Sequence, residues 1–302
     1  MSSWKPPLWP GVHIGLAGLC VLLATEGYIL WNFFGREYDL GSFLLALAAL
    51  LDLALLVAVG YLLYALTRLG YSLDDGALTI TWGLVRHVLP LSTIDEVSTT
   101  YEPKQGAYIL AMPWHGYYVG RGNGGESGNV LFFATSRSPE QTAFIFTAES
   151  IYAVSPRDRD SFVETLRRKI LGRRTDDKGE SARAAMLGPK VLFLPFWQDR
   201  VCQALALTAL LGNLAIFAQV SFRFPFLPPV LPLHYNVLGE IDFLGTRWEA
   251  FKIPGIGLAV LLANFAIVLL LHSKERLASG LLLATATLVQ VVLLVAAVKI
   301  LP

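Results

Sequence analysis

The sequence predicts a membrane protein with five transmembrane helices and an inserted β-barrel-like domain that a C-terminal helix closes. Three observations predict this fold class. Of the 302 residues, 54% are hydrophobic and only 16% are charged, whereas soluble domains carry about 25% charged residues. Five apolar segments are each long enough to cross a hydrocarbon core of about 30 Å. Between the second and third of them, residues 68–190 are polar and rich in strand and turn patterns.

The five predicted spans are the first elements to justify. They cover residues 12–34, 40–66, 201–222, 253–271 and 277–298. The first span is too long for the apolar core of a secretory signal, so we expect it to remain as an anchor. The short turn at residues 35–39 makes the first two spans an antiparallel hairpin. The expected domains are a two-helix hairpin (1–69), the β domain (70–172), a basic linker with an interfacial segment (173–197), and a three-helix domain (198–302).

The distribution of basic residues predicts the orientation in the membrane. Residues 68–190 hold 15 of the 24 lysines and arginines, and they are densest just before the third span. Loops with such an excess usually stay in the cytoplasm. We therefore expect the N-terminus and residues 68–200 to be cytoplasmic. The loop 223–252 and the C-terminus are then extracytoplasmic.

The insert carries the period-2 alternation of half-buried strands. Leu78, Ile80 and Trp82 alternate with threonines, and a turn signal of two aspartates and a glycine precedes them. The predicted strands are Ala77–Trp82, Arg86–Leu89, Ile94–Tyr101, Tyr117–Arg121, Val130–Ala134 and Phe144–Ala148.

A helix is expected to follow the last strand. Ser155 is the predicted N-cap, and Pro156 takes the first helical position. Beyond them, four apolar residues share one helical face: Phe162, Val163, Leu166 and Ile170. A helix with such a face can close one end of a small barrel.

Two stretches of the insert resemble the bacterial pleckstrin-homology-like (PH-like) domains. The first is the end of a hairpin, Leu89-Pro90-Leu91-Ser92-Thr93-Ile94-Asp95-Glu96-Val97, and the second is the closure Tyr152-Ala153-Val154-Ser155-Pro156-Arg157-Asp158-Arg159-Asp160-Ser161-Phe162. The resemblance covers about one hundred residues and implies a binding or scaffolding module in a bacterial cell membrane. The first hairpin offers only Arg86 and His87 as cations, so we do not expect phosphoinositide binding. The basic run 167–174 suits attraction to anionic lipid.

The predicted outer loop carries a second motif, made of Pro232, His234, Tyr235, Asn236, Gly239, Asp242 and Arg247. This pattern resembles a bacterial membrane domain of unknown function that also occurs in toxin-immunity proteins, over about residues 198–272. Those proteins lack the insert. The loop could form a rigid turn, or it could recognise a ligand or partner. A metal site through His234, Glu240 and Asp242 fits no standard zinc spacing, so no metal is expected.

Polar residues inside the spans form the last group of candidates. Glu26 and Asp52 lie at similar predicted depths in the first two spans. They could form a proton or cation site, because acids within membrane helices usually face the bundle interior. Asn213 of the third span, with Gln219 and Gln290, could be their partner. Alternatively, each acid is hydrogen-bonded locally and holds the helices together.

No catalytic motif stands out, because no nucleophile lies in a pattern with a base. The function that we expect is non-catalytic: a binding, scaffolding or signalling module that displays the PH-like domain and binds a protein partner. The alternatives are a small transporter that uses Glu26 and Asp52, and a toxin-immunity-like protein. We expect no cofactor, and the net charge of +1 gives no reason to expect nucleic acid. Cys20 and Cys202 are interpreted as packing residues.

Overall fold

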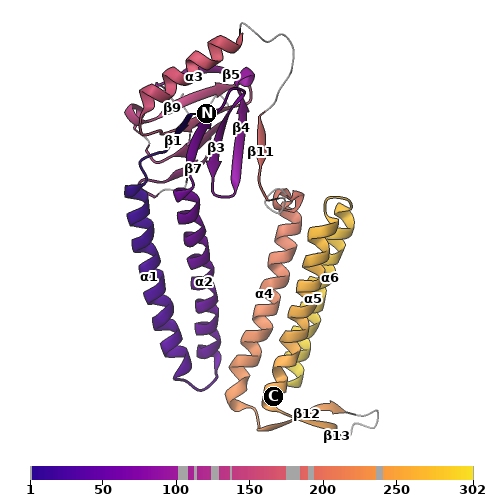
Figure 1. The fold of residues 1–302 in the computed structure, drawn as a ribbon. Coiled ribbons are helices and arrows are strands. Elements are labelled where there is room, and N and C mark those ends of the chain that lie inside the picture. Colours follow the sequence, from indigo (N-terminus) through magenta and orange to yellow (C-terminus); the bar gives the residue numbers. More distant parts are fainter. Residues whose placement is uncertain are drawn as a thin grey trace. The chain divides into compact units, whose positions relative to one another are not determined.

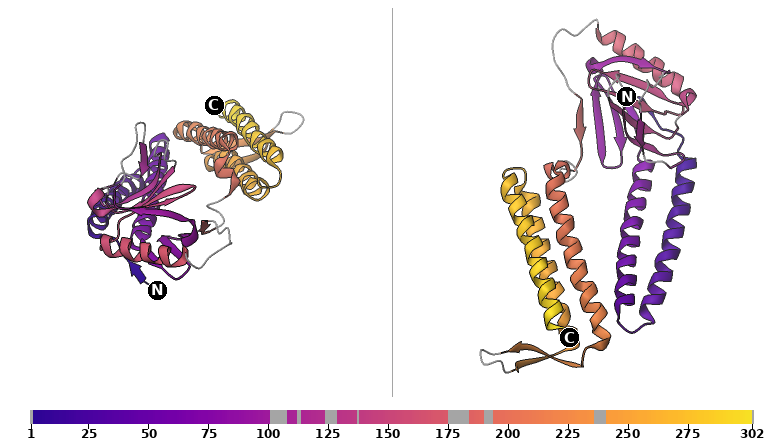
Figure 2. Two further views of the ribbon diagram at one scale, coloured as in Figure 1. Left: turned by 90° about the horizontal axis from the view of Figure 1, so that it is seen from above. Right: turned by 180° about the vertical axis from the view of Figure 1, so that it is seen from behind.

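A computed structural model describes residues 2–100, 108–111, 114–123, 129–136, 138–174, 184–189, 194–235 and 241–301. The chain forms two compact units, which are described separately. Unit 1 contains Met1–Thr25 and Asp52–Pro189, and unit 2 contains Glu26–Leu51 and Lys190–Pro302. Figures 1 and 2 show the elements of both units.

Five helices are long and apolar enough to cross a membrane. They are α1 (Trp9–Phe34), α2 (Leu40–Thr67), α4 (Arg200–Arg223), α5 (Lys252–Leu271) and α6 (Arg276–Ile300). Large apolar side chains such as Leu55 and Leu288 are more than half exposed along them, as expected for surfaces that face lipid rather than water. The prediction of a multi-pass membrane protein is therefore confirmed.

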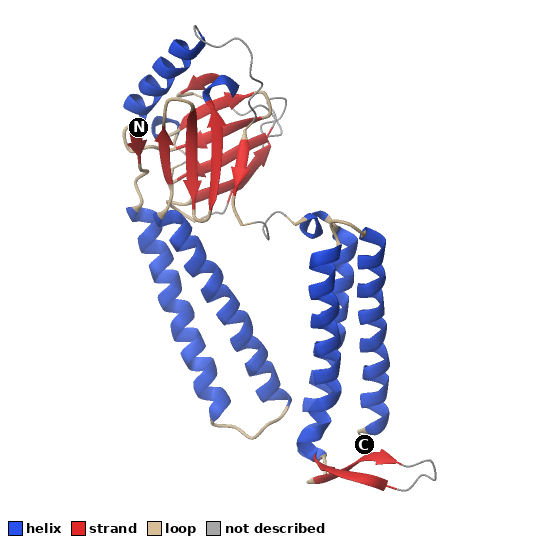
Figure 3. Cartoon of the chain, turned by 45° about the vertical axis from the view of Figure 1, so that its right-hand side comes forward, coloured by secondary structure: helices blue, strands red, loops and turns tan. Residues whose placement is uncertain are grey.

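In unit 2, α4, α5 and α6 pack against one another as a three-helix group (Figure 3). Their contact centres on small and apolar side chains: Ala209, Leu261 and Ala286 form one buried cluster. Small residues let membrane helices approach closely, where van der Waals packing replaces the hydrophobic driving force.

The domain in unit 1 has two sheets and one helix (Figure 3). The first sheet below is antiparallel, and the second is mixed because β8 and β10 are parallel. The five-stranded sheet has the order β1-β2-β3-β4-β11, and the six-stranded sheet has the order β5-β9-β10-β8-β7-β6. The bounds of the first sheet are β1 (Ser2–Trp4), β2 (Gly70–Leu73), β3 (Ala77–Trp82), β4 (Val85–Pro90) and β11 (Ala185–Leu187). Those of the second are β5 (Ile94–Ser98), β6 (Tyr108–Ala111), β7 (Tyr118–Asn123), β8 (Asn129–Ala134), β9 (Ala143–Thr147) and β10 (Ser150–Val154).

A single core joins the two sheets. Fully buried side chains of β3, β9 and α3 meet in it, among them Ile80, Ile145 and Phe162. Within the described residues, however, no strand pairing joins the two sheets. The closure of the predicted β-barrel-like domain is therefore not confirmed, and the domain is a pair of sheets that pack face to face.

The closing helix α3 (Arg159–Arg174) begins later than predicted. Asp158 is the N-cap, because its carboxylate accepts the backbone N–H of Ser161 at 3.1 Å. The hydroxyl of Ser155 is used elsewhere: it is buried and accepts the backbone N–H of Thr135 at 2.7 Å. The prediction of Ser155 as N-cap is therefore wrong. The predicted apolar face is confirmed, since all four of its residues are buried.

Candidate functional site

The inserted domain is built directly onto the ends of the first two membrane helices. Helix α2 ends at Thr67, and β2 starts three residues later at Gly70. On the other side, the segment before α1 forms β1, which pairs antiparallel with β2. The carbonyl oxygen of Lys5 also accepts the backbone N–H of Arg157 at 3.0 Å. The segment before α1 and the segment after α2 are thus both part of the domain.

Helix α1 also contacts the domain through two glycines. The indole N–H of Trp114 donates to the carbonyl oxygen of Gly11 at 2.9 Å. A Cβ at Gly11 would lie 2.4 Å from the carbonyl oxygen of Gly116, and one at Gly15 would lie 2.3 Å from the Trp114 ring. The close approach of α1 to the domain therefore requires glycine at both positions.

Helix α2 makes a matching contact. Gly83, in the turn between β3 and β4, has a φ of +56° and lies against Ala65 and Tyr61 of α2. Next to this turn, the indole of Trp82 donates to the hydroxyl of Tyr117 at 2.7 Å. The domain is thus fixed to both helices, and its orientation relative to them is set by packing rather than by a flexible linker.

The outer edge of β4 carries a strand from a distant part of the sequence (Figure 1). In β11, Met186 pairs with His87, and Leu187 pairs with Arg86. All three residues of β11 are exposed, so backbone pairing rather than burial holds the strand in place. A sheet edge that accepts an extended segment in this way is the geometry of β-strand addition.

The cations of the domain differ in their environments. His87 is buried against the ring of Phe133, with 4.6 Å between ring centroids. This burial, with the nearby charge of Arg121, lowers the pKa of His87 to about 4. Of the two cations predicted for the first hairpin, His87 is therefore uncharged at neutral pH, and only Arg86 is exposed.

The basic run of α3 makes contacts within the domain. The guanidinium of Arg167 donates two hydrogen bonds to the carbonyl oxygen of Val97, at 3.1 and 2.6 Å, and so covers the β5 edge. Lys169 forms an ion pair with Asp75 at 2.8 Å. These side chains hold α3 to the sheets, a structural role that the sequence did not reveal.

The predicted outer loop forms a β-hairpin in unit 2. Its strands are β12 (Val230–Tyr235) and β13 (Ile241–Thr246). The motif residues Pro232, His234 and Tyr235 lie in β12, and Asp242 lies in β13. Pairing brings His234 opposite Phe243, and the register shifts on both sides of His234. Asn236, Gly239 and Glu240 lie outside the described residues.

Arg247, the last motif residue, lies at the base of this hairpin. Its guanidinium lies over the ring of Phe224 at 4.8 Å, and its backbone N–H donates to the carbonyl oxygen of Pro229 at 3.2 Å. The ring of Tyr38 contacts Phe224 at 5.3 Å and Trp248 at 5.6 Å. The loop between α1 and α2 therefore meets the hairpin base, and Arg247 has a structural role there.

The intramembrane polar residues fall into two groups. One carboxylate oxygen of Glu26 and one of Asp52 are buried, and neither has a hydrogen-bond partner among the described residues. Asn213, expected as a partner of these acids, instead donates to Gln290 Oε1 at 3.1 Å and to the carbonyl oxygen of Pro254 at 3.0 Å. Gln290 in turn donates to the carbonyl oxygen of Gly257 at 2.8 Å. This network joins α4, α5 and α6.

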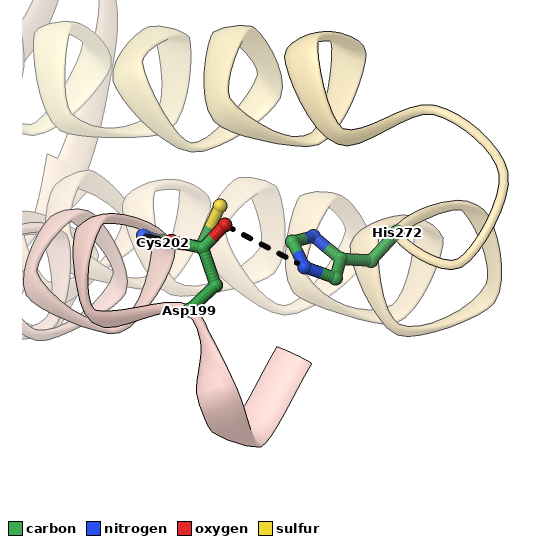
Figure 4. A group of neighbouring side chains, drawn as sticks. All are labelled: Asp199, Cys202 and His272. Carbon is green, nitrogen blue, oxygen red and sulfur yellow. Dashed lines mark hydrogen bonds and ion pairs between the residues drawn. The ribbon is translucent and has the colours of Figure 1, made fainter. Parts of the chain in front are cut away.

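The structure also groups polar residues that sequence reasoning missed (Figure 4). Asp199 caps α4 by accepting the backbone N–H groups of Val201 at 3.0 Å and Cys202 at 3.2 Å. Its other oxygen accepts Arg276 Nε at 2.5 Å and lies 3.7 Å from His272 Nε2. The hydrogen bond from Arg276 and those from the capping amides lower the pKa of Asp199 to about 2. Only the packing of α4 against the turn after α5 brings these residues together.

Comparison with known proteins identifies the inserted domain. Residues 69–170 match the family model described as Bacterial PH domain. The match spans β2 to β10 and most of α3, and it confirms the predicted PH-like domain. No curated protein and no solved structure matches the chain. The resemblance of the hairpin of β12 and β13 to a membrane domain of unknown function remains a prediction. The chain is a multi-pass membrane protein with a bacterial PH domain between its second and third membrane helices.

Proposed function

We propose that this protein is a non-catalytic membrane module that holds its PH domain at the cytoplasmic face of the bilayer as a docking site for a protein partner. The observation that carries the proposal is the joint between domain and membrane hairpin. The domain incorporates the segment before α1 as strand β1, and α1 contacts it through Gly11 and Gly15. An orientation fixed in this way suits a recognition surface that must face a partner at a set height above the bilayer.

The β4 edge is the part of the domain that best suits an extended partner segment. It already binds β11, which is only three residues long and has only exposed residues. A longer strand from a partner would form more backbone hydrogen bonds on the same edge and could replace β11. The exposed Arg86 beside this edge would favour a segment that carries acidic side chains.

Site-specific photocrosslinking in native membranes tests this proposal. A photoreactive amino acid at Arg86 should capture a protein of defined mass, because this position lies on the edge that binds β11. The control is the same amino acid at Glu149, which is exposed between β9 and β10. If both positions capture the same products, or neither captures any, the β4 edge is not the docking site.

The cytoplasmic placement of the domain needs its own test. Single cysteines at Glu149 of the domain and Val230 of the outer hairpin, both exposed, would report the two sides. The exposed Cys20 is replaced by serine, and the buried Cys202 is kept. In intact cells, a membrane-impermeant thiol reagent should label Val230→Cys only. Labelling of Glu149→Cys instead would invert the proposed orientation.

The outer hairpin is the second recognition surface that we propose. Its candidate residues are Pro232, His234, Tyr235, Asn236, Gly239, Asp242 and Arg247. Pairing of β12 with β13 supports this role, because it brings the strand with Pro232, His234 and Tyr235 beside the strand with Asp242. With the photoreactive amino acid at the exposed Val230 of the hairpin, His234→Ala should reduce capture of an extracytoplasmic partner, whereas capture from Arg86 should not change.

A second candidate function is ion-coupled transport through Glu26 and Asp52. The observation in its favour is the buried, unpartnered oxygen on each carboxylate among the described residues. Such groups within a membrane often belong to proton or cation pathways. In proteoliposomes with an entrapped pH indicator, Glu26→Gln and Asp52→Asn should abolish proton flux. Glu37→Gln, in the exposed loop after α1, is the matched control. Absence of flux in the unmodified protein would exclude proton coupling.

A further inference from the structure

Three potential metal ligands converge at one end of the three-helix group of unit 2 (Figure 4). Asp199 and Cys202 lie at the start of α4, three residues apart, and His272 follows the end of α5. One ligand atom from each residue lies within 4.8 Å of the other two. A thiol, an imidazole and a carboxylate are the groups that bind Zn²⁺ in proteins.

The environment of His272 is the second observation that indicates a ligand. The residue is only 7% exposed, and its ring contacts Phe196 edge-on at 5.9 Å. Its Nδ1 is buried without a hydrogen-bond partner in the described part of the chain. Its Nε2 is directed at Asp199, but at 3.7 Å it is too far for a hydrogen bond. A buried imidazole with an unpartnered nitrogen is unusual and needs an explanation, and its Nε2, which faces Asp199, is open to an ion.

We propose that Asp199, Cys202 and His272 form a binding site for a zinc-type divalent transition-metal ion. Thiolate and imidazole ligands select such ions over Mg²⁺ and Ca²⁺, which prefer oxygen. Small movements of the side chains would bring all three ligand atoms onto one ion. A fourth position stays open to water or to another ligand. The ion would join the start of α4 to the turn between α5 and α6.

Arg276 is the group that would compete with a cation here, because it bonds the carboxylate of Asp199. Its side chain, however, is 70% exposed, so the guanidinium can turn into water when the ion binds. Asp199 then offers the ion its Oδ2, because the capping amides of α4 bind only Oδ1. The ion pair and the metal site are therefore alternative states of the same carboxylate.

Cobalt binding to the purified full chain in detergent tests the proposal. After metals are removed with a chelator, Co²⁺ should bind at one ion per chain and give the near-ultraviolet absorption band of a cobalt–thiolate bond. Zn²⁺ should displace it. Cys202→Ser should abolish the band and weaken Co²⁺ binding on the order of 100-fold. Cys20→Ser, which changes the other cysteine, should retain both.

Further variants keep the test decisive if Cys202→Ser does not fold. His272→Gln should weaken Co²⁺ binding by a similar factor, whereas His13→Gln on α1 should not. Arg276→Gln should retain or strengthen Co²⁺ binding, because it removes the competing cation. The proposal is wrong if the folded, unmodified chain binds neither ion at one per chain. It is also wrong if the thiolate band survives in folded Cys202→Ser.

Discussion

At the residue scale, buried polar side chains determine how the PH domain closes. The hydroxyl of Tyr71 donates to the carbonyl oxygen of Phe133 at 2.6 Å and accepts the backbone N–H of Ser155 at 3.1 Å. Burial raises the pKa of this hydroxyl, so it stays a neutral donor. Tyr71 thus links β2 to the end of β8 and to the segment before α3.

Removing this hydroxyl should destabilise the domain. Tyr71→Phe leaves the carbonyl of Phe133 and the N–H of Ser155 without this partner, at a cost of about 1–3 kcal/mol. Hydrogen exchange of β8 and β10 in the full chain should accelerate accordingly. Tyr28→Phe, at a position 71% exposed on α1, is the control and should leave exchange in the domain unchanged. Equal exchange in both variants would show that the Tyr71 hydroxyl contributes little.

His87 makes the stability of the domain depend on pH. Its pKa falls from 6.5 to about 4 in the folded state, so between these values the unfolded chain binds more protons. Stability is therefore full above about pH 6.5 and falls as the pH drops towards 4, by at most about 1.4 kcal/mol per pH unit. Urea unfolding midpoints at pH 7 and pH 5 measure this loss. His87→Gln should flatten the dependence, whereas His115→Gln, at an exposed position, should not.

At the element scale, the sequence predicted the strands and the helix whose burial shows as a local hydrophobic period. The alternation of β3 and the apolar face of α3 are visible in the sequence because each has one buried face. Strand β10 was missed because four consecutive residues are buried, which removes the alternation. Strands β1 and β11 have three residues each and exist only through pairing with distant edges.

The candidate sites, too, were predicted only where their residues lie close together in the sequence. The motif of residues 232–247 is nearly contiguous, so the sequence revealed it, although not that Pro232, His234, Tyr235 and Asp242 lie in paired strands. The sequence suggested Asn213 and Gln290 as partners of the acids, whereas tertiary packing pairs them with each other. Asp199 and His272 come from different helices, and no spacing rule joins them.

The polar network between α4, α5 and α6 requires glycine at one position. A Cβ at Gly257 would lie 2.5 Å from Gln290 Oε1 and 2.7 Å from Asn213 Nδ2. Gly257→Ala should therefore break hydrogen bonds of this network and destabilise the full chain by about 1–3 kcal/mol. The measurement is the thermal unfolding midpoint in detergent.

Helix α5 supplies the matched control for this prediction. A Cβ at Gly255 would meet nothing within 4 Å. Gly255→Ala should be neutral or stabilising by up to about 1 kcal/mol, because alanine has the higher helix propensity. Equal midpoints for the two variants would mean that the network adapts without loss.

At the scale of the whole molecule, the joint between α1 and the PH domain should behave as one cooperative contact. Gly15→Ala places a Cβ where the Trp114 ring lies, so the ring must move and weaken its hydrogen bond to Gly11. A loss of about 1.4 kcal/mol in the free energy of local opening corresponds to a tenfold higher population of the open state. Amides of β1 and β2 should then exchange about tenfold faster, while those of β9 should not change.

Gly18 provides the control for this last prediction, because it lies on the same helix and a Cβ there would meet nothing within 4 Å. In Gly18→Ala, the amides of β1, β2 and β9 should exchange as fast as those of the unmodified protein. Faster exchange in Gly15→Ala alone would show that contact with α1 holds the domain in place, as a docking module of fixed orientation requires. If the two variants exchange alike, β1 and the short link from α2 hold the domain without help from α1. In that case the proposed function would depend on those two connections alone.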